Sequence, residues 1–154
     1  MVEIIIAGSR SFFTYDIVRQ EVGAYLLTVD DYKNTVEIIS GGAKGADQLG
    51  EEFARRNLLK LKVFPADWGK WGRQAGYIRN DEMAEYAFKD GNKAVLFAFW
   101  DGFSRGTQHM INKALAFYPE FDVHVVRYNY GKNMHRTKLN ETLERLKLVK
   151  DIGI

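Results

Sequence analysis

Small polar and basic residues follow three apolar runs of the sequence, at the point where each run stops at a glycine-containing turn. These turns are Gly8-Ser9-Arg10, residues 40–47 (Ser-Gly-Gly-Ala-Lys-Gly-Ala-Asp) and residues 101–107 (Asp-Gly-Phe-Ser-Arg-Gly-Thr). Glycine allows a ligand to approach the backbone closely. A helix that begins after such a turn offers unpaired N–H groups and a partial positive charge. The residue types therefore predict a site for phosphate or a nucleotide.

The turn at residues 40–47 combines Ser40, Lys44 and Asp47 with three glycines, Gly41, Gly42 and Gly45. We expect its backbone N–H groups to hold phosphate. Asp47 falls in the first turn of a predicted helix, where the helix dipole favours a carboxylate, and it could equally accept hydrogen bonds from ribose hydroxyls. The pattern is neither a Walker loop nor Gly-x-Gly-x-x-Gly. A tight strand-to-helix turn also needs glycine, so a purely structural interpretation stays open.

The turn at residues 101–107 predicts an anion cradle made by Ser104, Thr107 and the N–H groups between them. Gly106 and Thr107 open a helix, and Thr107 shares a stripe with apolar residues that face the sheet. Arg105 either closes over the ligand or lies in solvent. Asp101 and Gly102 precede the cradle, and Asp101 is a second candidate for holding ribose.

Arg79 falls on the apolar face of a predicted helix, where an unpartnered arginine is costly to bury. It either pairs with a local carboxylate (Asp81, Glu82 or Asp101) or binds an anionic ligand, for which a guanidinium is well shaped. Arg10 has the same two interpretations.

Three aromatic residues flank the start of the helix that carries Arg79: Trp68, Trp71 and Tyr77. One of them could stack on a base, although wide rings serve as core or oligomer contacts more often. The histidines His109, His124 and His135 form no metal set by spacing. We also read no Ser-His-Asp or paired-carboxylate arrangement, and we expect no metal and no required cofactor.

Length and composition indicate one domain over residues 1–154, with 46% apolar residues and no cysteine. The absence of cysteine excludes disulfides and thiolate metal sites. No apolar run approaches the roughly 20 residues of a membrane helix, and the first residues show no secretory leader. We therefore expect a cytoplasmic protein. The 22 basic residues are matched by 20 acidic ones, which gives no argument for nucleic acid.

Apolar runs and helical spacing alternate along the chain. Continuous apolar runs predict strands at residues 3–7, 35–40, 61–64, 94–99 and 123–126, of which 94–99 is the most apolar and so central. Helices are predicted between them, after a cap at Thr14, from Ala46 to Ala54, from about 74 to 88 and from about 105 to 117. This alternation predicts an α/β fold with a parallel sheet of about five strands and helices on both faces.

The core spans residues 3–127, and the rest is a basic, aromatic tail with a final helix (128–154). That helix starts near Thr137 and uses Leu139, Leu143 and Leu146. The tail and the residue before it carry basic residues and tyrosines that could touch nucleic acid or form a solvated strap: Arg127, Tyr128, Tyr130, Lys132, Arg136 and Lys138.

The motifs together resemble the SLOG superfamily, nearest to its stand-alone YspA-like branch. The resemblance covers residues 3–127 and rests on motifs in the family's order, namely residues 8–10, 40–47, 66–68 (Ala-Asp-Trp), 72–83 (Gly72, Ala75-Gly76, Arg79-Asn80 and Met83) and 100–107. It implies a Rossmann-like, doubly wound fold that binds nucleotides or derivatives such as NAD, ADP-ribose or their cyclic relatives. Relatives commonly dimerise, so the resemblance also implies a homo-oligomer.

Two branches of the superfamily suggest alternatives. The Lonely Guy enzymes cleave the N-glycosidic bond of nucleoside 5′-monophosphates and carry Arg-Lys-x-x-Met and Pro-Gly-Gly-x-Gly-Thr-x-x-Glu. Here Asn80 replaces the lysine and Met110 replaces the glutamate, and a thioether cannot handle a proton. Hydrolysis would need Asp47, Glu82 or Asp101 instead. The DNA-processing protein DprA has a similar glycine turn and binds single-stranded DNA.

The sequence therefore favours a nucleotide-binding sensor or sequestering module without a membrane partner. Its predicted ligand-binding residues are Gly8, Ser9, Arg10, Ser40, Gly41, Gly42, Lys44, Gly45, Asp47, Trp68, Arg79, Asn80, Asp101, Gly102, Ser104, Gly106 and Thr107. A phosphoribohydrolase that uses Asp101, Glu82 or Asp47 is the enzymatic alternative, and DprA-like binding of single-stranded DNA is the third.

Overall fold

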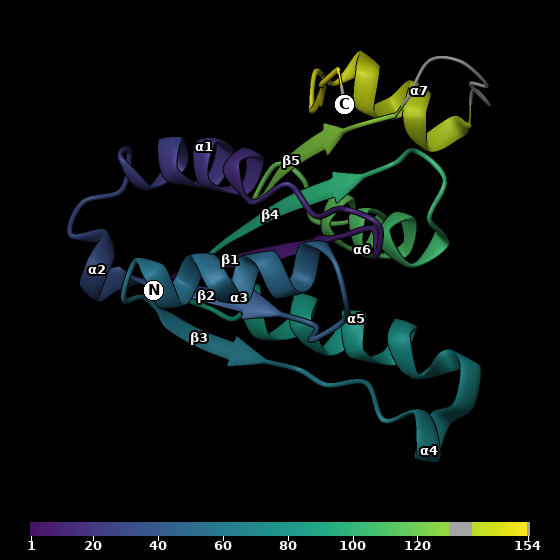
Figure 1. The fold of residues 1–154 in the computed structure, drawn as a ribbon, viewed down its shortest axis with the longest axis horizontal. Helices are drawn as coiled ribbons and strands as arrows, with labels where there is room; N and C mark the ends of the chain where they lie inside the picture. Colours follow the sequence, from purple (N-terminus) through teal and green to yellow (C-terminus); the bar gives the residue numbers. More distant parts are fainter. Residues whose placement is uncertain (130–136, 154) are drawn as a thin grey trace.

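Six parallel strands form a single sheet in the computed structural model, which describes residues 1–129 and 137–153 (Figure 1). The strands are β1 (Val2–Gly8), β2 (Val36–Ser40), β3 (Lys60–Val63), β4 (Lys93–Trp100), β5 (Phe121–Arg127) and β6 (Val149–Asp151). Their order across the sheet is β3-β2-β1-β4-β5-β6, and every neighbouring pair is parallel. The predicted α/β class and the central place of β4 are confirmed.

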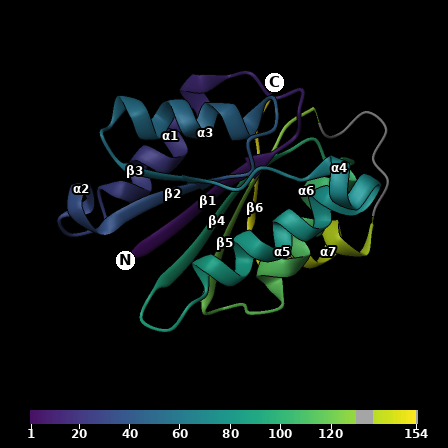
Figure 2. The same ribbon diagram turned by 90° about the horizontal axis from the view of Figure 1, so that it is seen from below.

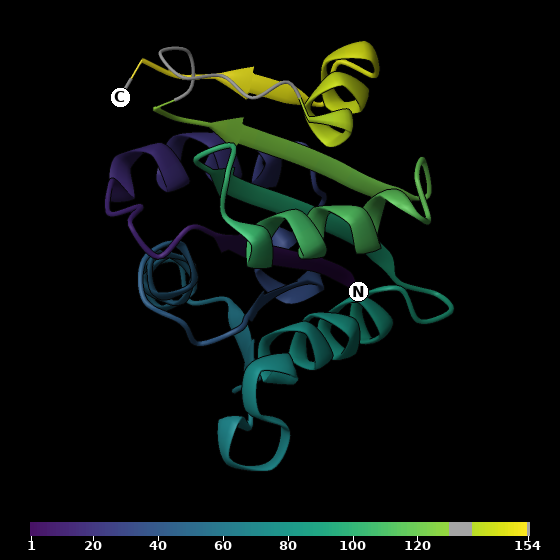
Figure 3. The same cartoon turned by 90° about the vertical axis from the view of Figure 1, so that its right-hand side faces the viewer.

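Helices cover both faces of the sheet (Figure 2). One face carries α1 (Tyr15–Leu26) and α3 (Ala46–Arg56). The other carries α5 (Ala75–Ala87), α6 (Arg105–Leu115) and α7 (Lys138–Arg145), with α5 and α6 side by side (Figure 3). Three short helical turns complete the described elements: α2 (Tyr32–Thr35), α4 (Trp68–Trp71) and the 3₁₀ turn η1 (Gly72–Gln74).

The two faces of the sheet bury separate apolar clusters, which explains why the strands read as continuous apolar runs. In β1, Ile5 packs toward α5 and α6, whereas Ile4 and Ile6 pack toward α1 and α3. β4 is buried from Ala94 to Trp100. Alternate residues of these strands thus pack into the cores on opposite sides of the sheet, and neither face of the strands is polar.

The structure has six strands where the sequence predicts about five. The additional strand, β6, pairs with β5 from Val125 to Arg127. It is only three residues long and largely exposed, so it leaves too short a pattern to be recognised by periodicity. The helix before it, α7, begins as predicted, because the Thr137 hydroxyl accepts a hydrogen bond from the N–H of Asn140 at 3.1 Å.

The expectation that a solvated basic strap begins at Arg127 is wrong. It is the last residue of β5, and its side chain is 1% exposed. Its guanidinium donates to Asp151 at 2.6 and 2.9 Å, to Asn140 at 2.6 Å and to Glu144 at 3.0 Å. These contacts join β5, α7 and β6. Tyr128 is also buried, whereas Tyr130, Lys132 and Arg136 lie outside the described residues.

The chain winds outward from β1 in both directions. From β1 it builds β2 and β3 on one side, and it then crosses to build β4, β5 and β6 on the other. The strand order therefore reverses between β1 and β4, where doubly wound sheets bind ligands beyond the strand ends. Among the described residues, no helix has the length and apolar character needed to cross a membrane.

Candidate functional site

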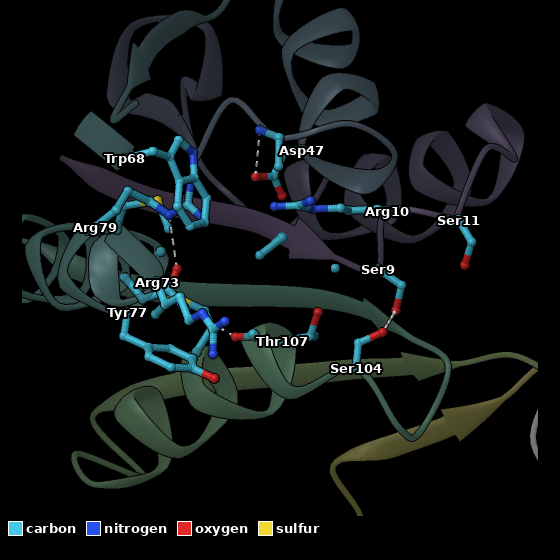
Figure 4. A pocket seen from close by; sticks show the side chains of 18 residues that line it. Ser9, Arg10, Ser11, Asp47, Trp68, Arg73, Tyr77, Arg79, Ser104 and Thr107 are labelled. Carbon is cyan, nitrogen blue, oxygen red and sulfur yellow. Dashed lines mark hydrogen bonds between the residues drawn. The ribbon is translucent and has the colours of Figure 1, made fainter. Parts of the chain in front are cut away.

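A cavity of about 420 Å³ lies beyond the ends of β1 and β4, at the point where the strand order reverses (Figure 4). Segments far apart in the sequence form its walls: the end of β1 and the turn after it, the start of α3, the α4 to α5 segment and the start of α6. The lining residues are Ala7, Gly8, Ser9, Arg10, Ser11, Ala43, Asp47, Trp68, Arg73, Gly76, Tyr77, Arg79, Asn80, Met83, Ser104, Gly106, Thr107 and Met110.

The end of β1 and the turn after it lie tightly against the backbone at the end of β4. The N–H of Ser9 donates to the carbonyl of Phe99 at 2.9 Å. A Cβ added to Gly8 would lie 2.1 Å from that same carbonyl oxygen. Only glycine permits this approach. The contact brings the turn after β1 next to the loop that leads into α6.

The N-terminus of α6 is open toward the cavity. Ser104 is the N-cap residue, but its hydroxyl is bonded to the Asp101 carboxylate at 2.9 and 3.0 Å and to Ser9 Oγ at 3.0 Å, and it does not cap the helix. The N–H groups of Arg105, Gly106 and Thr107 have no acceptor among the residues that the structure describes. Three donors at a positive helix end are therefore available to an anion.

Thr107 adds a hydroxyl to this helix end. The residue is 6% exposed and lines the cavity. Its Oγ1 makes no hydrogen bond with any described residue. The oxygen itself is accessible rather than fully buried, so a ligand or water in the cavity can form a hydrogen bond with it.

Arg79 approaches the same cavity from α5. Its Nη1 donates to the carbonyl of Gly41, and its Nε donates to Oδ1 of Asn80 at 3.1 Å. Burial lowers the pKa of Arg79, and the nearby Asp47 carboxylate opposes that shift. Its Nη2 has no hydrogen-bond partner in the described part of the chain. One donor group thus remains for a ligand on a guanidinium that is otherwise held in place.

Asn80 links Arg79 to α6. Its Nδ2 donates to the carbonyl of Gly106 at 3.2 Å and lies 3.2 Å from Nδ1 of His109. Burial lowers the pKa of His109, so its neutral ring can accept that bond. The Asn80 amide therefore has a partner for its oxygen and for its nitrogen, and it joins the two helices that flank the cavity.

Asp47 is buried in the cavity wall. Its Oδ2 accepts a hydrogen bond from the N–H of Ala43 at 3.1 Å. Burial raises its pKa to about 6, although the charges of Arg79 and Arg10 and the Ala43 N–H oppose the shift. Among the described residues that line the cavity, Asp47 is the one acidic residue.

The sequence predicts that the N–H groups of the turn at residues 40–47 hold phosphate, and some of these groups are already bonded within the protein. The N–H of Gly42 donates to Ser40 Oγ at 3.1 Å, and the N–H of Ala43 donates to Asp47. The N–H of Ala46, at the start of α3, donates to the carbonyl of Ser9 at 3.3 Å. Side chains and carbonyls of the protein itself thus occupy these donors. The sequence could not show this, because the spacing of glycines does not indicate which side chains and carbonyls accept hydrogen bonds from the turn.

A second cavity, of about 380 Å³, adjoins the first. The two share four lining residues: Arg10, Ala43, Trp68 and Arg79. The guanidinium carbon of Arg10 lies 6.0 Å from the centre of the Trp68 ring. Arg10 and Trp68 therefore stand at the boundary between the two spaces. The remaining walls of the second cavity are Gly41, Gly42, Lys44, Pro65 and Ala66.

The structure brings most of the predicted site residues to these two cavities. The first is lined by Gly8, Ser9, Arg10, Asp47, Trp68, Arg79, Asn80, Ser104, Gly106 and Thr107, and the second additionally by Gly41, Gly42 and Lys44. Four others line neither and shape the turns: Ser40, Gly45, Asp101 and Gly102. The Asp101 carboxylate is bonded to the N–H groups of Phe103 and Ser104 at 2.9 and 2.8 Å. Glu82 is exposed on α5 and lines neither cavity.

Sequence reasoning overlooked several lining residues, of which Arg73 adds a charge. Arg73 lies in η1, four residues before Tyr77 and seven before Asn80. That spacing continues the face of α5 into the preceding turn. The sequence contains this spacing, but the helix was predicted to begin at about residue 74, one residue after Arg73.

Part of the chain is similar in sequence to known proteins. Residues 2–71 match the model of the family described as YspA, cpYpsA-related SLOG family. The chain is also 33% identical over 82 residues to the Gene 61 protein of Mycobacterium phage D29, an alignment that spans 50% of this chain and 62% of that protein. No solved structure matches the chain significantly.

Proposed function

We propose that the chain binds the phosphate of a nucleotide or nucleotide-derived ligand at the N-terminus of α6, on the premise that it is a member of the SLOG superfamily, a family model of which matches residues 2–71. Membership suggests that a nucleotide-related ligand is bound or processed. The residues of the cavity suggest how it is held.

The observation that carries the proposal is the convergence of unsatisfied donors on one space. The N–H groups of residues 105–107, the Thr107 hydroxyl and Nη2 of Arg79 have no acceptor among the described residues, and Gly106, Thr107 and Arg79 line the same cavity. A phosphate offers several strong acceptor oxygens and a negative charge. It would satisfy these donors and gain from the helix dipole at once.

The rest of the first cavity suits the nucleoside. Met83, Met110 and Ala7 are apolar and buried, and Trp68 and Tyr77 present half-exposed rings at the rim. A base would lie against these side chains, with an aromatic ring covering it. Ribose hydroxyls would donate to the Asp47 carboxylate. Ligands of this kind include NAD, ADP-ribose and their cyclic relatives, bound by a sensor or sequestering module.

A thermal-shift screen against nucleoside 5′-monophosphates, NAD and ADP-ribose, followed by calorimetry on the ligands found, tests the proposal. We expect saturable binding that Thr107→Val weakens by about tenfold or more, because it removes a hydroxyl that donates to a charged oxygen and keeps the shape. Thr142→Val, on α7, is the matched control and should leave binding unchanged. Absence of binding by every compound would refute the proposal.

Hydrolysis of the N-glycosidic bond is the second candidate, and one observation favours it. Asp47 is a buried carboxyl group in the cavity, and burial raises its pKa to about 6, which suits a group that exchanges protons near neutral pH. The other two carboxylate candidates, Asp101 and Glu82, do not line the cavity. Chromatography of the same mixtures detects any free base. Release that Asp47→Asn abolishes, while binding persists, would establish the enzyme.

A further inference from the structure

The second cavity is rich in positive charge. Arg10, Lys44 and Arg79 line it, and no Asp or Glu is among its lining residues. Lys44 forms no ion pair or hydrogen bond with any residue that the structure describes. The Arg10 side chain contacts the Trp68 ring, and the charges of Arg10 and Arg79 both act on the Asp47 carboxylate. That carboxylate lines the first cavity and not the second, so the three cations face the second cavity without an acidic group in its walls.

The positively charged second cavity adjoins the proposed phosphate site. Arg10 and Arg79 lie in the wall that the two cavities share, and Arg79 also approaches the N-terminus of α6 through Asn80. A ligand that fills the first cavity therefore reaches residues that also line the second. The Arg10 side chain points toward Trp68 at this boundary (Figure 4), so two guanidinium groups lie where the cavities adjoin.

The second cavity has a volume of about 380 Å³, which is space for an anionic group. Its walls on the β2 side are Gly41 and Gly42. The N–H groups of Gly42 and Ala43 already have acceptors. Recognition there would depend on side-chain charge, chiefly from Arg10 and Lys44.

We infer that the second cavity is a second anion subsite for the same ligand, and that the ligand is a nucleotide with a diphosphate chain. One phosphoryl group occupies the N-terminus of α6, and the next lies between Arg10, Lys44 and Arg79. A group esterified to the second phosphate would extend toward Pro65 and Ala66. This inference rests on the proposed function, because it places the second group relative to the first.

The test compares two classes of nucleotide on the unaltered protein and on two lysine variants. The affinities of the 5′-mono- and 5′-diphosphates of adenosine, guanosine, cytidine and uridine are measured by calorimetry, without divalent cations, on the unaltered protein and on Lys44→Gln. Lys33→Gln, at an exposed lysine within α2, is the charge-matched control. We expect the best diphosphate to bind about tenfold tighter than its monophosphate. Lys44→Gln should remove most of that ratio and leave the monophosphate affinity unchanged.

The outcomes separate the two proposals. Equal affinity for mono- and diphosphates, or an equal loss for both in Lys44→Gln, would overturn the second subsite while leaving phosphate binding at α6 in place. Binding of neither class would refute the proposed function and the second subsite together. Thr107→Val supports the arrangement if it weakens both ligands equally, because Thr107 contacts the first phosphate alone.

Discussion

Arg79 and Asn80 are consecutive residues of α5, and the Nε of the first donates a hydrogen bond of 3.1 Å to Oδ1 of the second. The amide nitrogen of Asn80 is in turn bonded to the carbonyl of Gly106. The guanidinium that faces the cavity is thus tied to the helix whose N-terminus lies beside it. This pair sets the relative positions of the two groups that we expect to hold phosphate.

Replacing Asn80 should loosen Arg79 without removing its charge. Asn80→Ala eliminates the acceptor of the Nε bond and the link to α6, so ligand affinity should fall by about tenfold, the equivalent of one charge-assisted hydrogen bond. Calorimetry with the best nucleotide of the screen measures this. Asn112→Ala, an exposed position on α6, is the control. Unchanged affinity in Asn80→Ala would show that Arg79 needs no positioning.

Gly41 lies where Arg79 and Asp47 meet. A Cβ added there would lie 2.5 Å from Nη1 of Arg79 and 2.8 Å from Oδ2 of Asp47. Gly41→Ala should therefore displace the guanidinium and weaken nucleotide binding by at least about tenfold. Gly23→Ala on α1, where a Cβ meets no atom within 4 Å, should leave binding intact. Circular dichroism and thermal unfolding distinguish a displaced arginine from a chain that does not fold.

Asp47 should make stability depend on pH. Burial raises its pKa from 3.8 to about 6, so the folded chain holds a proton that the unfolded chain has released. The Asp47 contribution is complete below about pH 4 and is lost as pH rises through about 6. Urea unfolding between pH 4 and 7 should show this loss, of about 2–3 kcal/mol. Asp47→Asn should remove it from the pH profile, and an unaltered profile would contradict the shifted pKa.

Arg127 should be among the residues most important for stability. Its buried guanidinium joins β5 to Asn140 and Glu144 on α7 and to Asp151 on β6. Arg127→Met should lower the free energy of unfolding by about 3–5 kcal/mol. Lys150→Met breaks an exposed pair with Glu21 at 3.0 Å and should cost less than about 1 kcal/mol. Similar losses in the two variants, measured by urea unfolding, would contradict a structural role for Arg127.

The fold was predictable because its signals are local and periodic. The apolar run at residues 94–99 identified the central strand β4, and the glycine turns marked where strands end. β6 was not predicted, because a strand of three residues is too short to show a periodic pattern. Glu3 escaped as well: it reads as a strand residue, yet it is buried opposite Glu37, and its pKa is raised to about 8 mainly by burial. Strand pairing brings these two carboxyl groups together, and no spacing along the chain shows it.

The sequence predicted which residues form the site better than it predicted what each residue does there. The spacing of the motifs predicted that Arg79, Asp47 and Thr107 lie at one edge of the sheet, and in the structure they line one cavity. The spacing could not reveal that Ser40 and Asp47 accept hydrogen bonds from the N–H groups of Gly42 and Ala43, nor that Asp101 is bonded to the loop before α6. Such internal hydrogen bonds decide which donors remain for a ligand, and they depend on side-chain orientation.

Backbone amide spectra of the ¹⁵N-labelled protein, titrated with a nucleoside 5′-monophosphate that binds in the screen, test the central idea most directly. We predict the largest shifts at the amides of Arg105, Gly106 and Thr107, which are unpaired in the described structure, and small shifts at Gly42 and Ala43, which already donate to side chains. Shifts concentrated at residues 41–45, with none at 105–107, would contradict it.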